Sequence, residues 1–432
     1  MRKEDLISDL LYLLMAGIVL LVGFLVITPA INNGLLGREM PENVLFIIVA
    51  LIVGIVLNVI LMEVGHLIGA KIGGYTILST NILGFNFYKD FSNNSAKGQL
   101  KFRFKSFNGL TGETIIEPKQ EKSNPMFYVF FPLILFLLEF CAMYLVVMLA
   151  PKDADTHFET IQIIKYGLVI STTIAGCMVL YDYFPAKLDT MNDGYRLISL
   201  KKKINIEAFN SQLSMEAHEY KGDLNYEIKI FDEITDFTAK VNLEGAMRKF
   251  VEGNGEEAIS IIDKCLENKA NVSRSTEKTL LLNKIYIVYL TRGTEAGNEL
   301  YKALDEETKD AVKRCKTYEG IRVYLLYIGL SEKSKSEIKY SCNKIKKYYD
   351  RLTLGEIAKE MKLVSLALEK IIDFDPKLVD KETIKDVCNS KEDNEIYKTL
   401  ISKISDNSEK KEEDQNKKEE TEEQSKEDKE EE

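Results

Sequence analysis

Four apolar segments, each long enough to cross a lipid bilayer, constrain this chain more than any other feature. A helical span needs about 20 predominantly apolar residues. The first segment is longer than the apolar part of a signal peptide, and no small-residue cleavage site follows it, so we interpret it as a retained anchor. The sequence therefore predicts an α-helical polytopic membrane protein of about four spans. These lie near Leu6–Ile31, Val44–Ala70, Met126–Ala150 and Thr160–Phe184.

The loops between these segments differ in their lysine and arginine content. The loops at 32–43 and 151–159 carry one such residue each, whereas the loop at 71–125 carries eight, and several more follow the fourth segment. Loops rich in Lys and Arg remain on the cytoplasmic side of a membrane. We therefore expect an integral protein of a bacterial-type plasma membrane, with its N- and C-termini both in the cytoplasm.

The loop at 71–125 has the pattern of strands. Gly73-Gly74 ends the second apolar segment, and short β-rich runs follow at 75–78 and 85–88. Residues Leu100–Phe104 alternate between apolar and basic side chains, which is typical of a half-exposed strand. The pattern predicts a small β insertion beside the cytoplasmic mouth of the spans.

The pattern changes to amphipathic helices in the region 199–404, which we expect to be an α-helical cytoplasmic domain. Residues Leu243–Leu266 resemble one helix-turn-helix unit of the tetratricopeptide class, but no clean period of about 34 residues recurs. Both a helical repeat and a plain helical domain fit this pattern, and the missing period favours the plain domain. The tail at 405–432 contains 14 acidic residues, 6 lysines and no aromatic residue, and it is predicted to be disordered.

Composition excludes some functions. The chain has a formal net charge of −10, most of which belongs to the acidic tail, so no strongly basic surface remains for nucleic acid. The six cysteines form no C-x-x-C pair, which favours reduced thiols. Only three histidines are present, which excludes a zinc site built from several histidines of one chain.

Two ionisable residues, Glu63 and His66, lie within the second apolar segment. Charged groups at membrane depth are costly, which makes these two residues functional candidates. Positions 62 and 66 share one face of a helix. The spacing is that of H-E-x-x-H, in which two histidines hold zinc and the glutamate is the general base, but Met62 occupies the first histidine position.

A second polar group follows the fourth apolar segment. It comprises Asp182, Pro185 and the run Asn192-Asp193-Gly194. A proline and an Asp-Gly pair by themselves are also typical of a helix stop and a turn. Together with the motif in the second segment, however, this group resembles the site-2 protease family of intramembrane zinc metalloproteases over roughly residues 40–200. The matching residues are Glu63, Gly65, His66, Pro185, Asp193 and Gly194.

The resemblance implies that residues 1–198 form a site-2-protease-like membrane domain. It also implies that Glu63 is the general base and that His66 and Asp193 are ligands of a zinc cofactor. The chain departs from the family where Met62 replaces a histidine and where Asp182 stands in place of an asparagine. The third span has Phe131 and Leu135 where the family usually has glycine and asparagine, and the segment between Pro185 and Asp193 is longer than in many members.

Glu139, in the third span, offers a further carboxyl group. It fits a substitute metal ligand, a partner of His66, or a hydrogen-bonded carboxyl at a helix interface. A catalytic zinc site needs three protein ligands and an open position for water. With Met62 in place of a histidine, we expect zinc to be weakly held or absent.

These observations predict a site-2-protease-like membrane protein with a degenerate zinc site. We expect it to be non-catalytic or weakly active and to bind a membrane-embedded peptide or protein, with a cytoplasmic protein partner at residues 199–404. The alternative is an active intramembrane zinc metalloprotease that uses Glu63, His66 and Asp193, with Glu139 as a further ligand. A third interpretation is an unrelated membrane scaffold.

Overall fold

The computed structural model describes residues 3–32, 40–91, 98–104, 113–119, 123–149, 158–188, 190–223, 225–349, 352–388 and 394–405. The chain forms two compact units. The first contains Met1–Ala217 together with two returning segments, Glu233–Thr238 and Ala270–Ser275. The second contains the remaining residues, from His218 onward.

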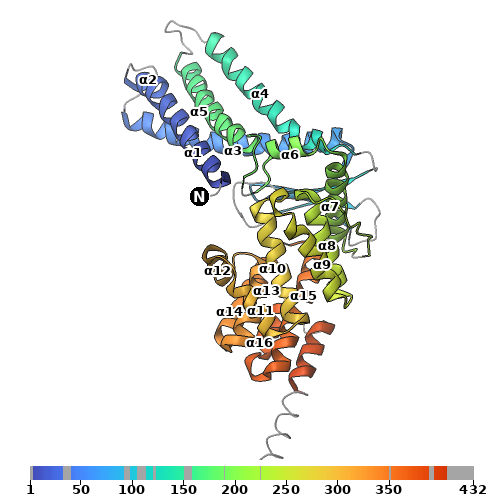
Figure 1. Ribbon diagram of the computed structural model, residues 1–432. Helices are drawn as coiled ribbons and strands as arrows, with labels where there is room; N and C mark the ends of the chain where they lie inside the picture. The colour runs from blue at the N-terminus through green and yellow to red at the C-terminus, as the bar shows by residue number, and fades with distance from the viewer. Residues whose placement is uncertain are drawn as a thin grey trace, which may run out of the picture. The chain divides into compact units, whose positions relative to one another are not determined.

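Four helical stretches of the first unit are long and apolar enough to cross a membrane, which identifies the chain as a membrane protein (Figure 1). The first stretch passes through a π-helical turn between two α-helices, and the other three are single α-helices. The elements are α1 (Lys3–Val22), η1 (Gly23–Ile27), α2 (Thr28–Asn32), α3 (Met40–Ile72), α4 (Pro125–Leu149) and α5 (Phe158–Asp182).

Glycines allow α3 and α4 to approach at backbone distance. A Cβ atom at Gly65 would lie 2.5 Å from the Cα atom of Pro132, and one at Gly69 would lie 2.2 Å from the carbonyl oxygen of Phe127. Small residues at such spacings are the usual means by which membrane helices pack closely, because lipid supplies no hydrophobic force between them. The motif helix α3 is therefore fixed directly against α4.

A polar layer joins α3, α4 and α5 farther along the spans. The side chain of Asn58 donates to the carbonyl oxygen of Ser171 at 3.0 Å, and the Ser171 hydroxyl donates to Glu139 Oε1 at 2.6 Å. All three residues are buried. In a bilayer core, where water is absent, polar groups must be satisfied within the protein, so this layer fixes the register of the three helices.

A four-stranded antiparallel sheet with the order β3-β2-β1-β4 lies between α3 and α4 in sequence. A two-residue turn at Leu83-Gly84 joins β1 to β2, and both residues have positive φ angles (52° and 88°), as the right-handed twist of a tight hairpin requires. The strands are β1 (Tyr75–Ile82), β2 (Phe85–Asp90), β3 (Gln99–Phe104) and β4 (Glu113–Pro118).

Main-chain hydrogen bonds attach this sheet to the ends of the two spans. The carbonyl oxygen of Gly74 accepts from the backbone N–H of Lys119, just after β4, and the carbonyl oxygen of Gly73 accepts from the N–H of Asn124, just before α4. The Ser123 hydroxyl donates to the same Gly74 carbonyl at 2.9 Å. The start of β1 and the end of β4 are therefore held at the point where α3 ends and α4 begins.

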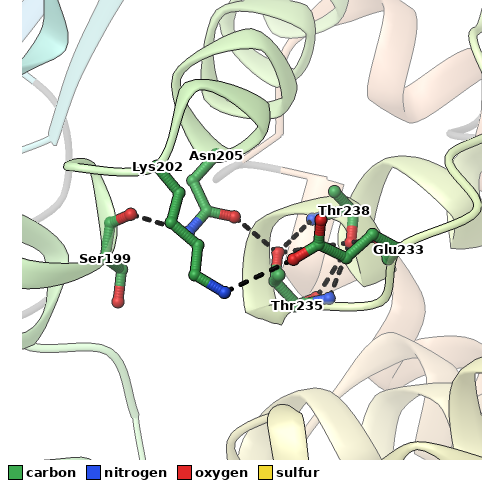
Figure 2. Close-up of polar contacts among 6 residues, drawn as sticks. All are labelled: Ser199, Lys202, Asn205, Glu233, Thr235 and Thr238. Atoms are coloured by element: carbon green, nitrogen blue, oxygen red, sulfur yellow. Dashed lines mark hydrogen bonds and ion pairs between the residues drawn. The ribbon is translucent and has the colours of Figure 1, made fainter.

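Two helices follow the last span, α6 (Asp193–Ser199) and α7 (Lys203–Lys221), and a returning segment binds near the junction between them. Figure 2 shows Asn205, near the start of α7, which donates to the carbonyl oxygen of Ser199 at 2.7 Å and accepts from the Thr235 hydroxyl at 2.7 Å. Lys202 also pairs with Glu233 at 3.3 Å. The returning segment Glu233–Thr238 thus belongs structurally to the membrane unit.

The second unit is built from helices. Its core contains a buried charge pair, in which Arg322 lies 3.5 Å from Glu360 and donates to Asn283 Oδ1 at 3.0 Å. The helices that contribute to it, apart from a last one at 395–405, are α8 (Asp236–Val251), α9 (Gly255–Glu267), α10 (Arg274–Thr291), α11 (Thr294–Lys302), α12 (Glu306–Lys313), α13 (Tyr318–Tyr327), α14 (Lys335–Tyr349), α15 (Leu354–Phe374) and α16 (Lys381–Val387).

The predicted fold class is confirmed at the coarse level: in the part of the chain that the structure describes, most residues are helical, and there are four potential spans and a small antiparallel sheet. Three of the strands were predicted, and β4 was not. All six cysteines are unpaired. Apart from Ser405, the tail predicted to be disordered lies outside the described residues.

Candidate functional site

Glu63 and His66 lie on α3, and both are buried, with 4% and 6% of their surfaces exposed. The imidazole of His66 lies against the ring of Tyr128 on α4, with ring centroids 4.8 Å apart. Its Nδ1 atom is 3.0 Å from the carbonyl oxygen of Tyr128. The close approach of α3 to α4 therefore determines the orientation of this histidine.

A proline makes the Tyr128 carbonyl available for this contact. In an α-helix a carbonyl oxygen accepts from the N–H four residues later, and four residues after Tyr128 is Pro132, which has no N–H. The unpaired carbonyl instead receives a hydrogen bond from His66. The next carbonyl, that of Val129, accepts from the Tyr183 hydroxyl at 2.9 Å, so two side chains of the site are held by the main chain of α4.

The hydrogen bond to Tyr128 also determines which nitrogen of His66 carries a proton. A carbonyl oxygen only accepts, so Nδ1 must be the donor, and Nε2 of the neutral ring is left with its lone pair. Nε2 lies 3.6 Å from Asp193 Oδ2, which is too long for a hydrogen bond. Two electron-rich atoms thus face each other in a buried position, an arrangement that a cation or a proton between them would stabilise.

Asp193 is positioned by the residues on either side of it. The Asn192 side chain caps α6 by accepting from the Tyr195 N–H at 2.9 Å, and it donates to the carbonyl oxygens of Tyr181 and Phe184 at 3.0 and 3.1 Å. A Cβ atom at position 194 would lie 2.3 Å from the carbonyl oxygen of Tyr183, so only glycine fits there. The Asn-Asp-Gly run therefore fastens the start of α6 to the end of α5.

Charged groups surround Asp193, which is 4% exposed. Arg196 Nη1 lies 3.1 Å from its Oδ1, and Asp182 Oδ1 accepts from its backbone N–H at 3.4 Å. Burial raises the pKa of Asp193, and the Arg196 guanidinium opposes that shift. The second oxygens of Asp182 and Asp193 are buried and have no hydrogen-bond partner among the described residues.

The sheet reaches the site through Thr114 of β4. Its hydroxyl lies 3.3 Å from Glu63 Oε2 and donates to it. The predicted general base, the predicted ligands and the β insertion are therefore gathered at one place. α3 contributes Glu63 and His66, α6 contributes Asp193, and β4 contributes Thr114.

The donor set fits a zinc ion only in part. Around a tetrahedral zinc, two ligand atoms lie roughly 3.3 Å apart, so the 3.6 Å between His66 Nε2 and Asp193 Oδ2 suits two ligands of one ion. The position of the third ligand is Met62, whose thioether is a poor zinc ligand. Within the described ranges, no three His, Cys, Asp or Glu side chains are grouped so that they could hold a metal ion. The residues present therefore do not complete a zinc site.

Glu139 lies in the polar layer described above and not at this site. Its Oε1 accepts from Ser171, which also contacts Asn58. Asn58 precedes His66 by eight residues on the same helix, which is about 12 Å along the axis. Of the three alternatives for Glu139, this placement favours the hydrogen-bonded carboxyl at a helix interface.

Sequence reasoning missed several residues that build the site. It did not identify Asn192 as the residue that joins the start of α6 to the end of α5. It also did not identify Arg196 as the partner of Asp193 or the Tyr128 carbonyl as the acceptor for His66. An Asn-Asp pair before a short helix is a recognisable N-cap signal, and a proline inside an apolar helix indicates a free carbonyl four residues earlier. The contact of Thr114 with Glu63 depends on tertiary packing and has no local signal.

Comparisons with models of known protein families, with curated proteins and with solved structures found no match for this chain.

Proposed function

We propose that this chain is a site-2-protease-like integral membrane protein whose degenerate site binds a membrane-embedded peptide or protein segment without cleaving it. One observation carries the proposal. His66 and Asp193, which are 127 positions apart in the sequence, lie 3.6 Å from each other beside Glu63, while Met62 occupies the position of the first histidine ligand.

The absence of hydrolysis follows from the chemistry of water. Zinc lowers the pKa of a bound water from 15.7 to about 7, and without that shift a carboxylate base cannot generate enough hydroxide at neutral pH. Glu63 alone therefore does not supply a nucleophile. What the site retains is a buried set of polar groups at the end of a membrane-spanning helix, which suits the recognition of a segment within the membrane.

The alternative is an active intramembrane zinc metalloprotease. The observation that favours it is Asp193 Oδ2, a buried carboxylate oxygen without a hydrogen-bond partner among the described residues, which faces the free lone pair of His66. An active enzyme would use Glu63 as the base and both of these residues as ligands. It would need a further ligand in place of Met62.

The remaining regions complete the proposal. The helices at 199–404 would bind a cytoplasmic protein partner as a plain helical domain, with a tetratricopeptide-like unit at Leu243–Leu266, which spans parts of α8 and α9, as the alternative. The lysine-rich and arginine-rich loops support an orientation with both termini in the cytoplasm, in a bacterial-type plasma membrane.

Measuring the zinc content of the purified protein tests the proposal. We expect wild-type protein to carry much less than one zinc per chain and to leave a membrane peptide uncleaved. Met62→His should raise the zinc content, because it restores a nitrogen ligand one helical turn before His66. Zinc per chain can be measured by elemental mass spectrometry, with cleavage followed in the same samples.

Met143→His is the matched control, because it places a new histidine on α4, in a different part of the membrane unit. It should leave the zinc content at the wild-type level. One tightly bound zinc per wild-type chain, together with proteolysis that disappears in Glu63→Ala, would reject the non-catalytic proposal and establish the protease.

A further inference from the structure

One face of strands β2 and β3 carries five large apolar side chains that no other part of the described protein covers. Their exposed fractions range from 45% to 76%, although β-strands of a soluble unit normally cover their apolar face. We call this surface the aromatic face. Its members are Phe85, Phe87, Leu100, Phe102 and Phe104.

The aromatic face is a continuous surface. In the antiparallel register Phe85 is opposite Phe104 and Phe87 is opposite Phe102, so the four rings lie on the same side of the two strands. The Phe87 and Phe102 ring centroids are 5.1 Å apart, as are those of Phe85 and Phe104. Large contiguous apolar patches of this kind mark sites of interaction with proteins or membranes.

The other side of the same strands has the opposite character. Lys101 pairs with Asp90, and the Arg103 guanidinium lies 4.8 Å from the centre of the Tyr88 ring. Because alternate residues of a strand point to opposite sides, β3 is basic on one side and apolar on the other. The β2–β3 pair therefore has a polar side, whose charged groups have partners within the two strands, and an apolar side, which no other described part of the protein covers.

The bilayer is the surface that this aromatic face can reach. β1 begins at Tyr75, directly after α3 ends at Ile72, and β4 is hydrogen-bonded to the same Gly73-Gly74 turn from which α4 is entered. The sheet is thus tied to two spans at the depth where they leave the membrane. β3, the strand with the most exposed apolar residues, is one of the two edge strands of the sheet.

The charge pattern agrees with a lipid surface. Lys89 lies on the same side of β2 as Phe85 and Phe87, across from Leu100, whereas Lys101 and Arg103 lie on the opposite side of the sheet. Aromatic rings at the depth of the acyl–headgroup boundary, with a basic side chain beside the anionic headgroups, are the composition of membrane-interface segments.

We propose that the aromatic face lies in the membrane interface, in contact with the lipids of the leaflet from which α3 and α4 emerge. The sheet then lies on the bilayer surface along β2 and β3, while Thr114 of β4, the other edge strand, contacts Glu63. This inference is independent of the proposed function, because it requires neither a metal nor a bound segment.

The absence of tryptophan from the sequence provides a direct test. Phe102→Trp introduces a single tryptophan on the aromatic face, and brominated lipids quench only fluorophores that contact them. In proteoliposomes of phosphatidylcholine and phosphatidylglycerol we expect blue-shifted emission. We also expect stronger quenching by lipids brominated near the glycerol end of the acyl chain than by lipids brominated near its terminus.

Two reference variants calibrate the measurement. Leu137→Trp, at a 61% exposed position within the α4 span, should be quenched by lipids brominated deeper in the acyl chain. Phe374→Trp, at a 43% exposed position of α15 in the helical unit, should not be quenched. Phe87→Trp, opposite Phe102, repeats the test should one substitution impair folding.

Emission typical of water without lipid quenching would overturn the proposal. So would blue-shifted emission without quenching, which would show that a second copy of the chain or a bound peptide covers the aromatic face. A change of emission on dilution would identify the second copy.

Discussion

At the scale of single residues, Pro132 determines how His66 is oriented and protonated. It removes one N–H from α4, and the carbonyl that this leaves unpaired orients His66 at 3.0 Å. The resulting tautomer leaves the Nε2 lone pair directed at Asp193. The missing helical hydrogen bond at Pro132 therefore determines what the imidazole can bind. The sequence revealed Glu63, His66 and Asp193 as candidates, because each belongs to a local motif. It did not reveal their partners, because those contacts join distant segments.

A first prediction concerns this proline. Pro132→Ala supplies the missing N–H, which would pair with the Tyr128 carbonyl and deprive His66 Nδ1 of its acceptor. We expect His66 to change from a single Nδ1–H tautomer in the wild type to a mixture of tautomers. Imidazole ¹⁵N shifts report this, and with only three histidines the His66 signals can be identified by their loss in His66→Gln.

Pro125→Ala is the control for that experiment. Pro125 is the first residue of α4, where an N–H would have no partner within the helix, so its replacement should leave the His66 tautomer unchanged. A wild-type protein whose His66 carries its proton on Nε2 would contradict the proposed role of the Tyr128 carbonyl.

At the scale of elements, the sequence predicted the parts with a strong local pattern and missed those whose cause lies elsewhere. The four spans followed from length and hydropathy, two strands followed from short β-rich runs, and a third followed from the alternation at Leu100–Phe104. β4 was not predicted because Thr114-Ile115-Ile116 is short and breaks the alternation. It forms a strand because it pairs with the free edge of β1. The turn at Leu83-Gly84 was also missed, since leucine seldom adopts a positive φ angle.

The packing of α3 on α4 yields an element-scale prediction. Gly65→Ala would place a methyl group 2.5 Å from the Pro132 Cα atom, so the two helices must separate. We expect a loss of stability of about 1–3 kcal/mol, the usual cost of overpacking. Thermal unfolding in detergent, followed by circular dichroism, measures it.

Gly167→Ala is the matched control for the packing prediction, because it adds the same methyl group to α5 where no atom lies within 4 Å. It should leave the unfolding temperature unchanged or raise it slightly, since alanine favours helices. Equal effects of both substitutions would indicate that helix propensity, and not packing of α3 on α4, causes the change.

At the scale of the whole molecule, the chain passes between its two units several times. It leaves the membrane unit after Ala217, returns at Glu233–Thr238, and returns once more at Ala270–Ser275. The predicted boundary between residues 198 and 199 was drawn where the hydropathy changes. Hydropathy marks the end of the last span, whereas a compact unit also includes later segments that contact one another, as Thr235 does when its hydroxyl donates to Asn205.

Topology provides the prediction at this scale. Because positive loops remain in the cytoplasm, reporter fusions after Asn33 and Lys152 should indicate the outside, and fusions after Asn94 and Lys203 should indicate the inside. Paired reporters that are active on opposite sides of the membrane give an internal control at each position. A cytoplasmic signal from the fusion at Lys152 would reject the four-span topology.

The contact between Gly65 and Pro132 limits how this protein can vary over evolutionary time. Because the acceptor for His66 is a main-chain oxygen, that hydrogen bond does not depend on which side chain occupies position 128. Position 65, however, is restricted by the main chain of α4, because an added Cβ atom would lie 2.5 Å from the Cα atom and 2.7 Å from the nitrogen atom of Pro132. Since any residue at position 132 has these two atoms, a change of the proline does not make room for a side chain at position 65. We therefore expect glycine to be retained at position 65 even where the residue at position 132 differs.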